Sequence, residues 1–362
     1  MTAAAPARAY LNPLGFVYGP AAAAAISAGD ALPVACSGIA FTCGEILRRD
    51  HHGTISQETV SARELVQSSP DPELSALIAR TCGPRAPFQL GGTKLSFDHP
   101  KVMGVVNVTP DSFSGDGVAG NPEVAIAHGR HQIEASADLI DIGGESTRPG
   151  AAYVDPEEEC DRVLPVISAL KDLGVPISVD TRRAKVMTAA ISAGATIIND
   201  VSALSGDPDS LSAAAASGAA VILNHMRGTP QDMQDDPIYT DVLLDVFDEL
   251  EQRIEASMAA GIPRERLIVD PGLGFGKSLE HNLRLMANLA LFQGLGCPVL
   301  IGASRKSFIG AISGSLKPES RLPGSLAAAL GAVRRGANMV RVHDVAATRQ
   351  AMDVSIAVDG RN

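Results

Sequence analysis

Hydrophobic and polar positions follow a regular pattern along most of this chain, and the pattern begins near residue 101. From there, short runs rich in β-branched residues are separated by Ala-rich segments with helical spacing. Apolar strands that alternate with helices are predicted to be parallel, because each crossover helix returns the chain to the same end of the sheet. The predicted strands cover residues 102–107, 138–142, 177–180, 196–200, 220–224, 267–270, 299–302 and 339–342.

The number of these units predicts the fold class. The helical segments between the strands include residues 156–170, 183–192, 241–260, 279–291 and 323–335. Eight strand–helix units over about 260 residues is the count of a closed (β/α)8 TIM barrel. The alternative is a doubly wound open sheet, which normally has fewer strands. We therefore expect an α/β protein with a barrel over residues 99–362.

The segment before the barrel has a different pattern. Residues 1–98 contain short, irregular elements, with helices expected at 21–28 and 72–81 and strands within 32–41 and 93–97. We expect a small N-terminal α/β extension, and no motif in it indicates a chemistry. Its seven basic and eight acidic residues nearly cancel, so about −10 of the net charge of −11 belongs to the barrel segment.

Polar residues close nearly every predicted barrel strand. In a parallel barrel the carboxyl ends of all strands meet at one face, where active sites are built. So many polar residues at one face of the barrel predict a functional site, whereas one or two would be explained by chance or by contact with solvent. The strand-end residues are Asn107, Asp141, Asp180, Asn199, Asp200, Asn224, His225, Asp270, Ser304, Arg305, Lys306, Arg341 and His343.

Composition narrows the classes of function. Hydrophobic residues make up 45% and charged residues 20%, which disfavours intrinsic disorder. Aromatic residues are only 4%, without Trp, and the net charge is −11. A protein of this kind is a poor binder of nucleic acid or anionic membranes, so an anionic ligand needs a local basic pocket.

The cysteines and the N-terminal residues bear on the cellular compartment. Five scattered cysteines without a C-x-x-C pair indicate neither a disulfide framework nor a zinc site, which fits the reducing cytoplasm. The Ala-rich stretch 20–28 weakly resembles a signal peptide, but Pro13 and Gly15 interrupt its apolar part. We therefore expect a cytoplasmic protein without a membrane span.

Three strand ends favour binding of a flat heterocycle and a metal. The Asn107 amide oxygen is a hard ligand that suits Mg²⁺ beside phosphate oxygens. The Asp270 carboxylate can accept two parallel N–H bonds from an amino-heterocycle, and the Asn199 amide can both donate and accept. A buried Asp270 that only caps the next helix is the alternative. The glycines of DPGLGFGK, residues 270–277, do not form a dinucleotide fingerprint.

The last two strands supply cations. Lys306 and Ser307 enter a helix after the seventh strand, and Arg341 and His343 are two residues apart at the eighth. Barrels often bind phosphate near these two loops. Backbone N–H groups at the helix start add a site for a carboxylate or a phosphate.

Taken together, these motifs closely resemble those of dihydropteroate synthases, a pterin-binding enzyme family. NVTPDSFS, DLIDIGGESTRPGA, ISVDT, INDV, DPGLGFGK, SRKSFIG and VRVHD occur in the family's order between about residues 101 and 355. The resemblance implies a barrel enzyme that joins 7,8-dihydropterin-6-ylmethyl diphosphate to p-aminobenzoate and releases diphosphate in folate synthesis. It also implies Mg²⁺ as cofactor and a homodimer.

The resemblance assigns roles residue by residue. The pterin would be bound by Asp180, Asn199, Asp270 and Lys306. The diphosphate and Mg²⁺ would be bound by Arg148, Arg341, His343 and Asn107. The p-aminobenzoate site would be formed by Phe113, Thr147, Pro149 and Ser307.

The charges suggest a mechanism. Departure of diphosphate leaves a cationic carbon conjugated with the pterin, and Asp111 in the first loop is the candidate that stabilises it. Arg148, Lys306, Arg341 and His343 complete the candidate catalytic set. The loops after Asn107 and Gly144 would close over the site and exclude water.

One departure from the family keeps other functions open. The first loop usually reads FSDGG, but here residues 113–117 read FSGDG, which can shift a left-handed backbone position by one residue. A pterin-binding methyltransferase domain and a non-catalytic pterin-binding module are the alternatives. The cationic SRKS and R-x-H segments disfavour the former, and only the altered loop favours the latter.

Overall fold

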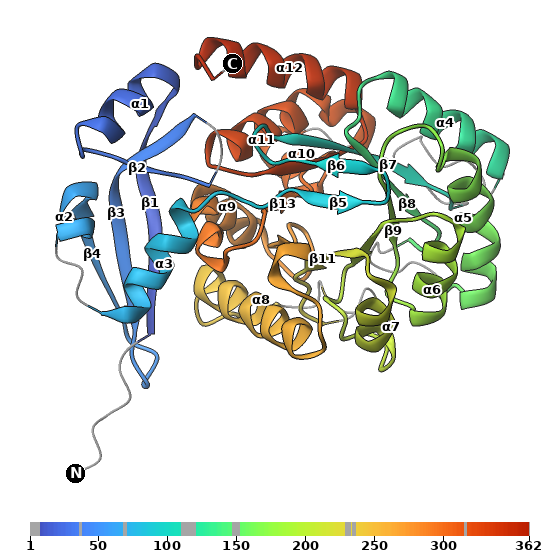
Figure 1. The fold of residues 1–362 in the computed structure, drawn as a ribbon, viewed down its shortest axis with the longest axis horizontal. Helices are drawn as coiled ribbons and strands as arrows, with labels where there is room; N and C mark the ends of the chain where they lie inside the picture. Colours follow the sequence, from blue (N-terminus) through green and yellow to red (C-terminus); the bar gives the residue numbers. More distant parts are fainter. Residues whose placement is uncertain are drawn as a thin grey trace.

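The structure is a computed structural model that describes residues 8–35, 38–67, 71–109, 121–146, 153–228, 233, 237–314 and 317–361. Its centre is a ring of eight parallel strands in the order β12-β11-β10-β9-β8-β7-β14-β13 (Figure 1). A single parallel bridge between Val269 and Val299 joins the two ends of this order. The barrel prediction is confirmed, and the open sheet is excluded. The strands are β7(Lys101–Asn107), β8(Leu139–Gly143), β9(Ile177–Asp180), β10(Ile197–Asp200), β11(Ala220–Asn224), β12(Leu267–Asp270), β13(Leu300–Ile301) and β14(Met339–Val342).

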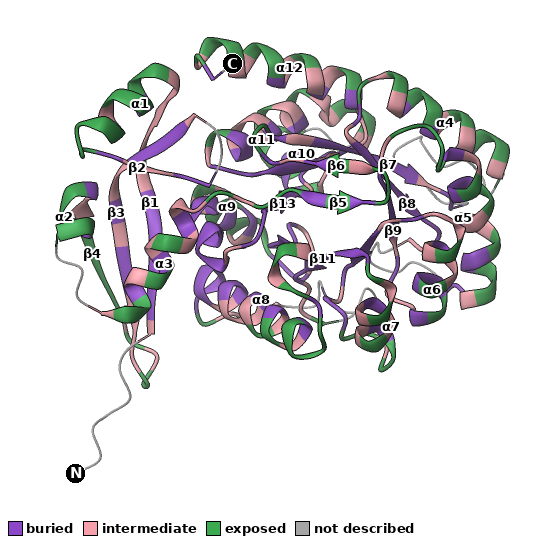
Figure 2. Cartoon of the chain, viewed as in Figure 1, coloured by how far each residue is buried: buried purple, intermediate pink, exposed green. Residues whose placement is uncertain are grey.

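Helices surround the ring, with exposed outer faces and buried inner faces (Figure 2). The helix α5 shows how the sequence specifies them. The Asp155 side chain accepts a hydrogen bond from the backbone N–H of Glu157, and acidic residues in the first turn match the helix dipole. The inner face of α5 buries Val163 and Val166. The helices are α4(Pro122–Glu134), α5(Pro156–Leu170), α6(Ala184–Ala193), α7(Ser210–Ser217), α8(Val242–Ala259), α9(Leu279–Ala287), α10(Ser307–Ser313), α11(Leu322–Arg334) and α12(Val345–Val358).

A hairpin closes the amino-terminal end of the barrel. It consists of β5(Phe88–Leu90) and β6(Thr93–Leu95), and its side chains pack in one apolar cluster with residues that begin the barrel strands. Phe88 and Phe97 meet edge to face with ring centroids 5.0 Å apart. Since this end is filled by apolar side chains, the opposite end of the barrel is the place for polar chemistry.

An antiparallel sheet precedes the hairpin and lies beside the barrel (Figure 1). Its strands are β1(Arg8–Tyr18), β2(Leu32–Pro33), β3(Ile39–Arg49) and β4(Ile55–Ser61), with helices α1(Gly19–Ser27), α2(Ala62–Gln67) and α3(Pro72–Cys82). The expected N-terminal α/β extension is therefore present. The pattern did not predict β1 or β4, because five consecutive buried residues in β1 and mostly exposed residues in β4 remove the alternation that signals a strand.

Charged residues of this sheet dock on α8. We call this contact the N-terminal seam, formed by Arg8, Tyr10 and Arg49 against Asp245, Asp248 and Glu251. Arg49 Nη1 lies 2.5 Å from Asp245 Oδ1, and the Tyr10 hydroxyl lies 2.9 Å from Asp248 Oδ2. The Tyr10 ring also meets Phe247 edge to face, so the sheet and the barrel share one apolar core.

Two predicted boundaries were wrong. The strand expected at 299–302 is shortened to β13, and the helix expected at 279–291 ends at Ala287, before a 3₁₀ segment at Leu289–Leu295. Asn288 explains the helix end, since its side chain donates to the Arg284 carbonyl and accepts from Asn12. Such local side-chain bonds compete with the helix. Among the described residues, no helix is long and apolar enough to cross a membrane.

Candidate active site

A hydrogen-bonded network lies at the carboxyl ends of four barrel strands. Arg341 from β14 donates from Nε to Asp141 Oδ2 at 2.6 Å and from Nη2 to Asp180 Oδ2 at 2.8 Å. Asn199 from β10 donates to the same Asp141 oxygen at 3.0 Å. We call Arg341, Asp141, Asp180 and Asn199 the Arg341 network. The structure thus brings three residues of the predicted site together through Asp141.

Burial changes the proton affinity of this network. Loss of hydration raises the pKa of Asp180 to about 7; Arg341 opposes the shift, and the nearby Asp141 adds to it. Burial alone would lower the pKa of Arg341, but Asp141 and Asp180 reverse this and raise it. The guanidinium therefore stays charged beside the Asp180 carboxyl, which retains a high affinity for protons or for N–H donors.

Asp270 lies beside this network, at the end of β12. Its side chain is 3% exposed, and Oδ1 accepts the backbone N–H of Gly272 at 2.8 Å. A Cβ placed on Gly302 would lie 3.8 Å from Asp270 Oδ2 and 3.9 Å from Arg341 Cβ, so both residues flank this glycine. Burial raises the pKa of Asp270 to about 6, opposed by its Gly272 hydrogen bond and by Lys306.

Lys306 reaches the same region from the loop after β13. Arg305 precedes it with φ +58°, a left-handed conformation that a non-glycine residue adopts only when its surroundings hold it there. Two hydrogen bonds from Arg305 to Asp344 do so, at 3.0 and 2.6 Å. Lys306 Nζ lies 4.0 Å from the centre of the Phe275 ring. Ser307 follows as the exposed first residue of α10.

His343 and Asn107 lie at the ends of two adjacent strands. His343 follows the last residue of β14, and its Nδ1 is 3.0 Å from the Ser304 hydroxyl. Asn107 is the half-buried last residue of β7, which pairs with β14. Within the described ranges, no three His, Cys, Asp or Glu side chains are placed to hold a metal ion together.

Part of the predicted site cannot be placed. The residues concerned are the catalytic candidate Asp111, the basic Arg148 and the p-aminobenzoate candidates Phe113, Thr147 and Pro149, all of which lie outside the described residues. The unusual FSGDG segment at 113–117 lies outside them as well.

Sequence reasoning underrated two residues. Asp141 was recognised only as a strand-end polar residue, yet it is 0% exposed and joins Arg341 to Asn199. The signal was a carboxylate inside the otherwise apolar run LIDIG. Lys277 was noted only within a glycine-rich motif, yet it is 3% exposed and held by hydrogen bonds. A lysine buried to this extent needs partners, which the sequence could not identify.

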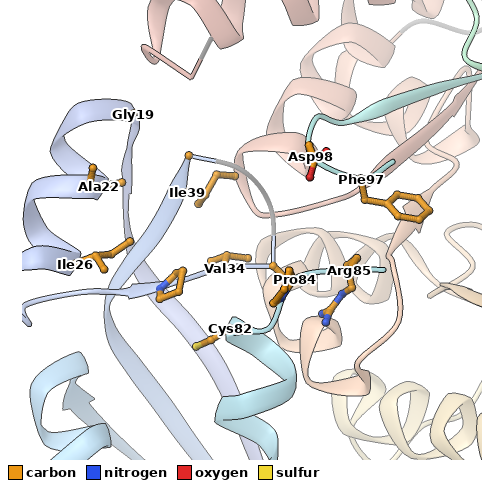
Figure 3. Close-up of a pocket in the computed structure, with 14 residues that line it drawn as sticks. Gly19, Ala22, Ile26, Val34, Ile39, Cys82, Pro84, Arg85, Phe97 and Asp98 are labelled. Carbon is orange, nitrogen blue, oxygen red and sulfur yellow. The ribbon is translucent and has the colours of Figure 1, made fainter. Parts of the chain in front are cut away.

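A cavity of about 400 Å³ lies elsewhere, between the N-terminal sheet and the barrel (Figure 3). Ala22, Val34, Cys82 and Phe97 give it a largely apolar lining, and Arg85 borders it. None of the site residues predicted from the sequence is among its lining residues. It is therefore separate from the strand-end site.

This chain is similar to a known protein family and to individual enzymes of that family. The model of the family "Pterin binding enzyme" matches residues 103–343. Dihydropteroate synthase of Neisseria meningitidis serogroup C is 48% identical over 268 residues, which are 73% of this chain and 95% of that protein. The Escherichia coli K12 enzyme is also 48% identical, over 73% of this chain and 93% of its own length.

Solved structures of dihydropteroate synthases are also similar to this chain. Dihydropteroate synthase of Yersinia pestis, in complex with a sulfonamide drug, superposes with a TM-score of 0.73 and 45% identity over 75% of this chain and 99% of that one. The Xanthomonas albilineans enzyme with 4-aminobenzoic acid has a TM-score of 0.71 and 50% identity, over 75% and 97% of the two chains. About a quarter of this chain lies outside these alignments.

Proposed function

Because this chain belongs to the dihydropteroate synthase family, the pterin-binding transferases of folate biosynthesis, we propose how its residues divide that reaction. The substrates are 7,8-dihydropterin-6-ylmethyl diphosphate and p-aminobenzoate, and the products are 7,8-dihydropteroate and diphosphate. The observation that carries the assignment is the Arg341 network. It gathers a fixed cation, two carboxylates and an amide from four strands.

The pterin binds to the carboxylates and the amide. Asp180 and Asp270 accept N–H groups from the ring edge, Asn199 adds an amide that donates and accepts, and Lys306 borders the ring. The raised pKa values of Asp180 and Asp270 support this role, since each carboxylate gains from a new N–H donor. Because the strands hold these groups in place, the ring is oriented without reorganisation of the site.

The diphosphate binds at Arg148, Arg341 and His343. Arg341 has five N–H donors, so a guanidinium that holds two carboxylates can still offer hydrogens to phosphate oxygens. Asn107 fits a role as the protein ligand of Mg²⁺, because this ion retains water and phosphate oxygens and needs few protein ligands. Bound there, Mg²⁺ would neutralise charge on the leaving diphosphate.

The chemical step separates bond breaking from bond making. The C–O bond to diphosphate breaks first, and the positive charge is shared between the exocyclic carbon and the pterin, near Asp111. The amine nitrogen of p-aminobenzoate, placed by Phe113, Thr147, Pro149 and Ser307, then forms the C–N bond and loses a proton. Arg148, Lys306, Arg341 and His343 stabilise the departing anion. Exclusion of water matters because water would capture the same cation.

The test is release of diphosphate from the pterin diphosphate by purified protein with Mg²⁺, with and without p-aminobenzoate. Release that requires p-aminobenzoate and yields dihydropteroate supports the proposal. Pterin binding without turnover would instead support a non-catalytic module. Transfer of a methyl group from a methylated pterin to a corrinoid protein would support the methyltransferase alternative.

We also propose a homodimer built on late barrel helices and a location in the cytoplasm. The described cysteines Cys43, Cys82, Cys160 and Cys297 are free thiols, which supports a reducing compartment. We place the boundary between extension and barrel at residues 98 and 99, with the extension as a docking or dimerisation subdomain. Light scattering of the full chain tests the dimer, since a monomer mass at micromolar concentration would contradict it.

A further inference from the structure

A chain of hydrogen-bonded polar groups lies beside the loop that follows Asp270, with Lys277 and His225 buried and Glu249 half-buried. Lys277 Nζ is 2.9 Å from His225 Nδ1, and it donates to the Phe275 carbonyl at 3.0 Å and to the His225 carbonyl at 3.4 Å. The three N–H groups of an ammonium match these three acceptors. We call Lys277, His225 and Glu249 the Lys277 clamp.

Glu249 on α8 orients the clamp. Its Oε2 lies 2.8 Å from His225 Nε2, and its other oxygen accepts from Arg227. Since an ionised carboxylate only accepts, Nε2 carries the hydrogen and the Nδ1 lone pair faces Lys277. Burial, then the charge of Lys277, lowers the pKa of His225 to about 4, so the ring is neutral near pH 7.

The clamp holds a loop that contains three glycines in the left-handed conformation. Residues 271–276 include Gly272, Gly274 and Gly276, with φ of +70°, +79° and +62°. Gly272 lies so close to the His225 carbonyl that a Cβ there would be 1.8 Å from its oxygen. Such glycines make the loop possible but contribute no side-chain packing, so hydrogen bonds must hold it. Asn282 accepts from the Gly274 N–H at 2.7 Å, the Tyr239 hydroxyl donates to the Gly276 carbonyl at 2.9 Å, and Lys277 holds the Phe275 carbonyl between them.

Two pterin-binding residues depend on this loop. Asp270 precedes it and accepts a hydrogen bond from Gly272. The Phe275 ring lies beneath the Lys306 ammonium, and the Phe275 carbonyl is one of the three acceptors of Lys277. Displacement of the loop would therefore move the partners of Asp270 and Lys306 together.

We propose that Lys277 is a positioning residue for the pterin: its ammonium, directed by His225 and Glu249, fixes the glycine-rich loop so that Asp270 and Lys306 face the ring. The inference rests on the proposed pterin-binding role of those two residues. Lys277 itself does not touch substrate in this role.

The charges around Lys277 fit this role. Burial lowers its pKa to about 7, while Asp270 on β12 and Glu249 on α8 raise it, and Lys306 and Arg227 lower it. Asp270 and Glu249 thus favour the protonated form that satisfies all three acceptors. A neutral amine has only two N–H groups and would leave one acceptor without its donor.

The experiment measures binding of the pterin diphosphate with Mg²⁺, without p-aminobenzoate, by calorimetry on the full chain. Lys277→Met should weaken binding about tenfold, because it leaves buried acceptors without donors and releases the loop. The KM for the pterin diphosphate should rise by the same factor, with kcat changed less than about threefold. Lys185→Met, at an exposed lysine on α6, is the matched control and should bind as the wild type does.

Two further comparisons separate positioning from a general loss of stability. His225→Asn keeps an acceptor near the Nδ1 position and should bind the pterin within about threefold of wild type, whereas His225→Leu should resemble Lys277→Met. In an Asp270→Asn background, Lys277→Met should add less than the tenfold loss that it causes in the wild type, because the part of the effect that acts through Asp270 is already removed and only the part through Lys306 remains. If Lys277→Met does not fold, the comparison of His225→Asn with His225→Leu tests the proposal instead.

Pterin affinity of Lys277→Met within twofold of wild type would overturn the inference. So would equal affinities of the two His225 variants, or additive losses in the Asp270 background. A wild-type protein that binds the pterin but shows no p-aminobenzoate-dependent release would refute the proposed reaction without affecting the binding result, so the two failures are distinguishable.

Discussion

The N-terminal seam and the Arg341 network both pair arginine with aspartate side chains, but the two regions have different roles. In the seam, Asp248 is approached by Arg8, Arg49 and the Tyr10 hydroxyl. In the network, one guanidinium serves both Asp141 and Asp180. Burial raises the pKa of Asp248 too, but several donors oppose it there, whereas the pKa of Asp180 reaches about 7.

The two regions differ in whether a buried hydrogen-bonding atom is left without a partner. Asp141 Oδ1 is buried and, within the part of the chain that the structure describes, has no hydrogen-bond partner. A buried acceptor without a donor destabilises the fold by about 1–3 kcal/mol. Such groups are few in native proteins, and a catalytic role or an ordered water or ion is among the explanations for them. The charged atoms of the seam are satisfied within the protein, whereas the network keeps an unpaired buried acceptor at the strand ends where we propose that substrate binds.

The largest expected effect is in the network. Asp270→Asn and Arg341→Ala should each lower p-aminobenzoate-dependent diphosphate release by about 10²–10³-fold, because each removes a preorganised charge from the site. Asp270→Asn should change the melting temperature little, whereas Arg341→Ala should also lower it, because Asp141 and Asp180 then lose a buried donor; turnover is therefore compared per folded molecule. Turnover within about twofold of wild type would contradict the role of the residue concerned.

Substitutions in the N-terminal seam should lower the stability of the protein and leave turnover unchanged. Arg49→Ala should lower the free energy of unfolding by about 2–3 kcal/mol, because it leaves Asp245 and Asp248 half-buried with fewer donors. Urea denaturation measures this loss, and kcat per folded molecule should be unchanged. Arg49→Lys is the control that keeps the charge. A seam variant that abolished turnover while remaining folded would break the distinction.

A smaller effect is expected from pH. The pKa of Asp270 is about 6 in the folded protein and about 3.9 in the unfolded chain, so between these values the folded state binds more protons. The contribution of Asp270 to stability therefore falls as pH rises through this window. The affinity for the pterin, in contrast, increases as pH rises, because binding needs the ionised Asp270 carboxylate.

The measurement is pterin affinity by calorimetry from pH 5 to pH 8. Affinity at pH 5 should be at least about tenfold weaker than at pH 7, since one pH unit below the pKa of Asp270 leaves about a tenth of this carboxyl ionised, and protonation of Asp180, whose pKa is about 7, adds to the loss. Asp270→Asn should remove the part of this dependence that is centred near pH 6. A wild-type affinity that does not change with pH would contradict the assignment.

The smallest effect is expected within the N-terminal sheet region itself. Arg63 and Asp30 form an ion pair at 2.7 Å, with both side chains more than half exposed. Arg63→Ala should change the free energy of unfolding by less than about 0.5 kcal/mol, because solvent screens exposed pairs. A loss comparable to that of Arg49→Ala would show that burial is not what distinguishes the seam.

Sequence pattern predicted the barrel well because its strands are buried on both faces and end in polar residues. Ile177–Asp180 and Met339–Val342 match the predicted bounds, and Asp180 and Arg341 meet as strand ends in a closed ring must. The seam could not be predicted, because Tyr10 and Asp248 are 238 residues apart and neither lies in a motif. The link from Lys277 through His225 to Glu249 could not be predicted either, because it joins a loop, a strand end and a helix, although Lys277 itself lies in the motif DPGLGFGK.

The seam also has a consequence for synthesis of the chain. Tyr10 leaves the ribosome 238 residues before Asp248, its partner on α8. At about 5–20 residues per second, the first strand waits roughly 10–50 seconds for the surface on which it docks. During that interval the face of β1 that carries Tyr10, which packs on Phe247 of α8 in the folded protein, is exposed to solvent unless a chaperone covers it. Nascent chains halted before α8 should therefore be more sensitive to protease in the first 50 residues than chains halted after it.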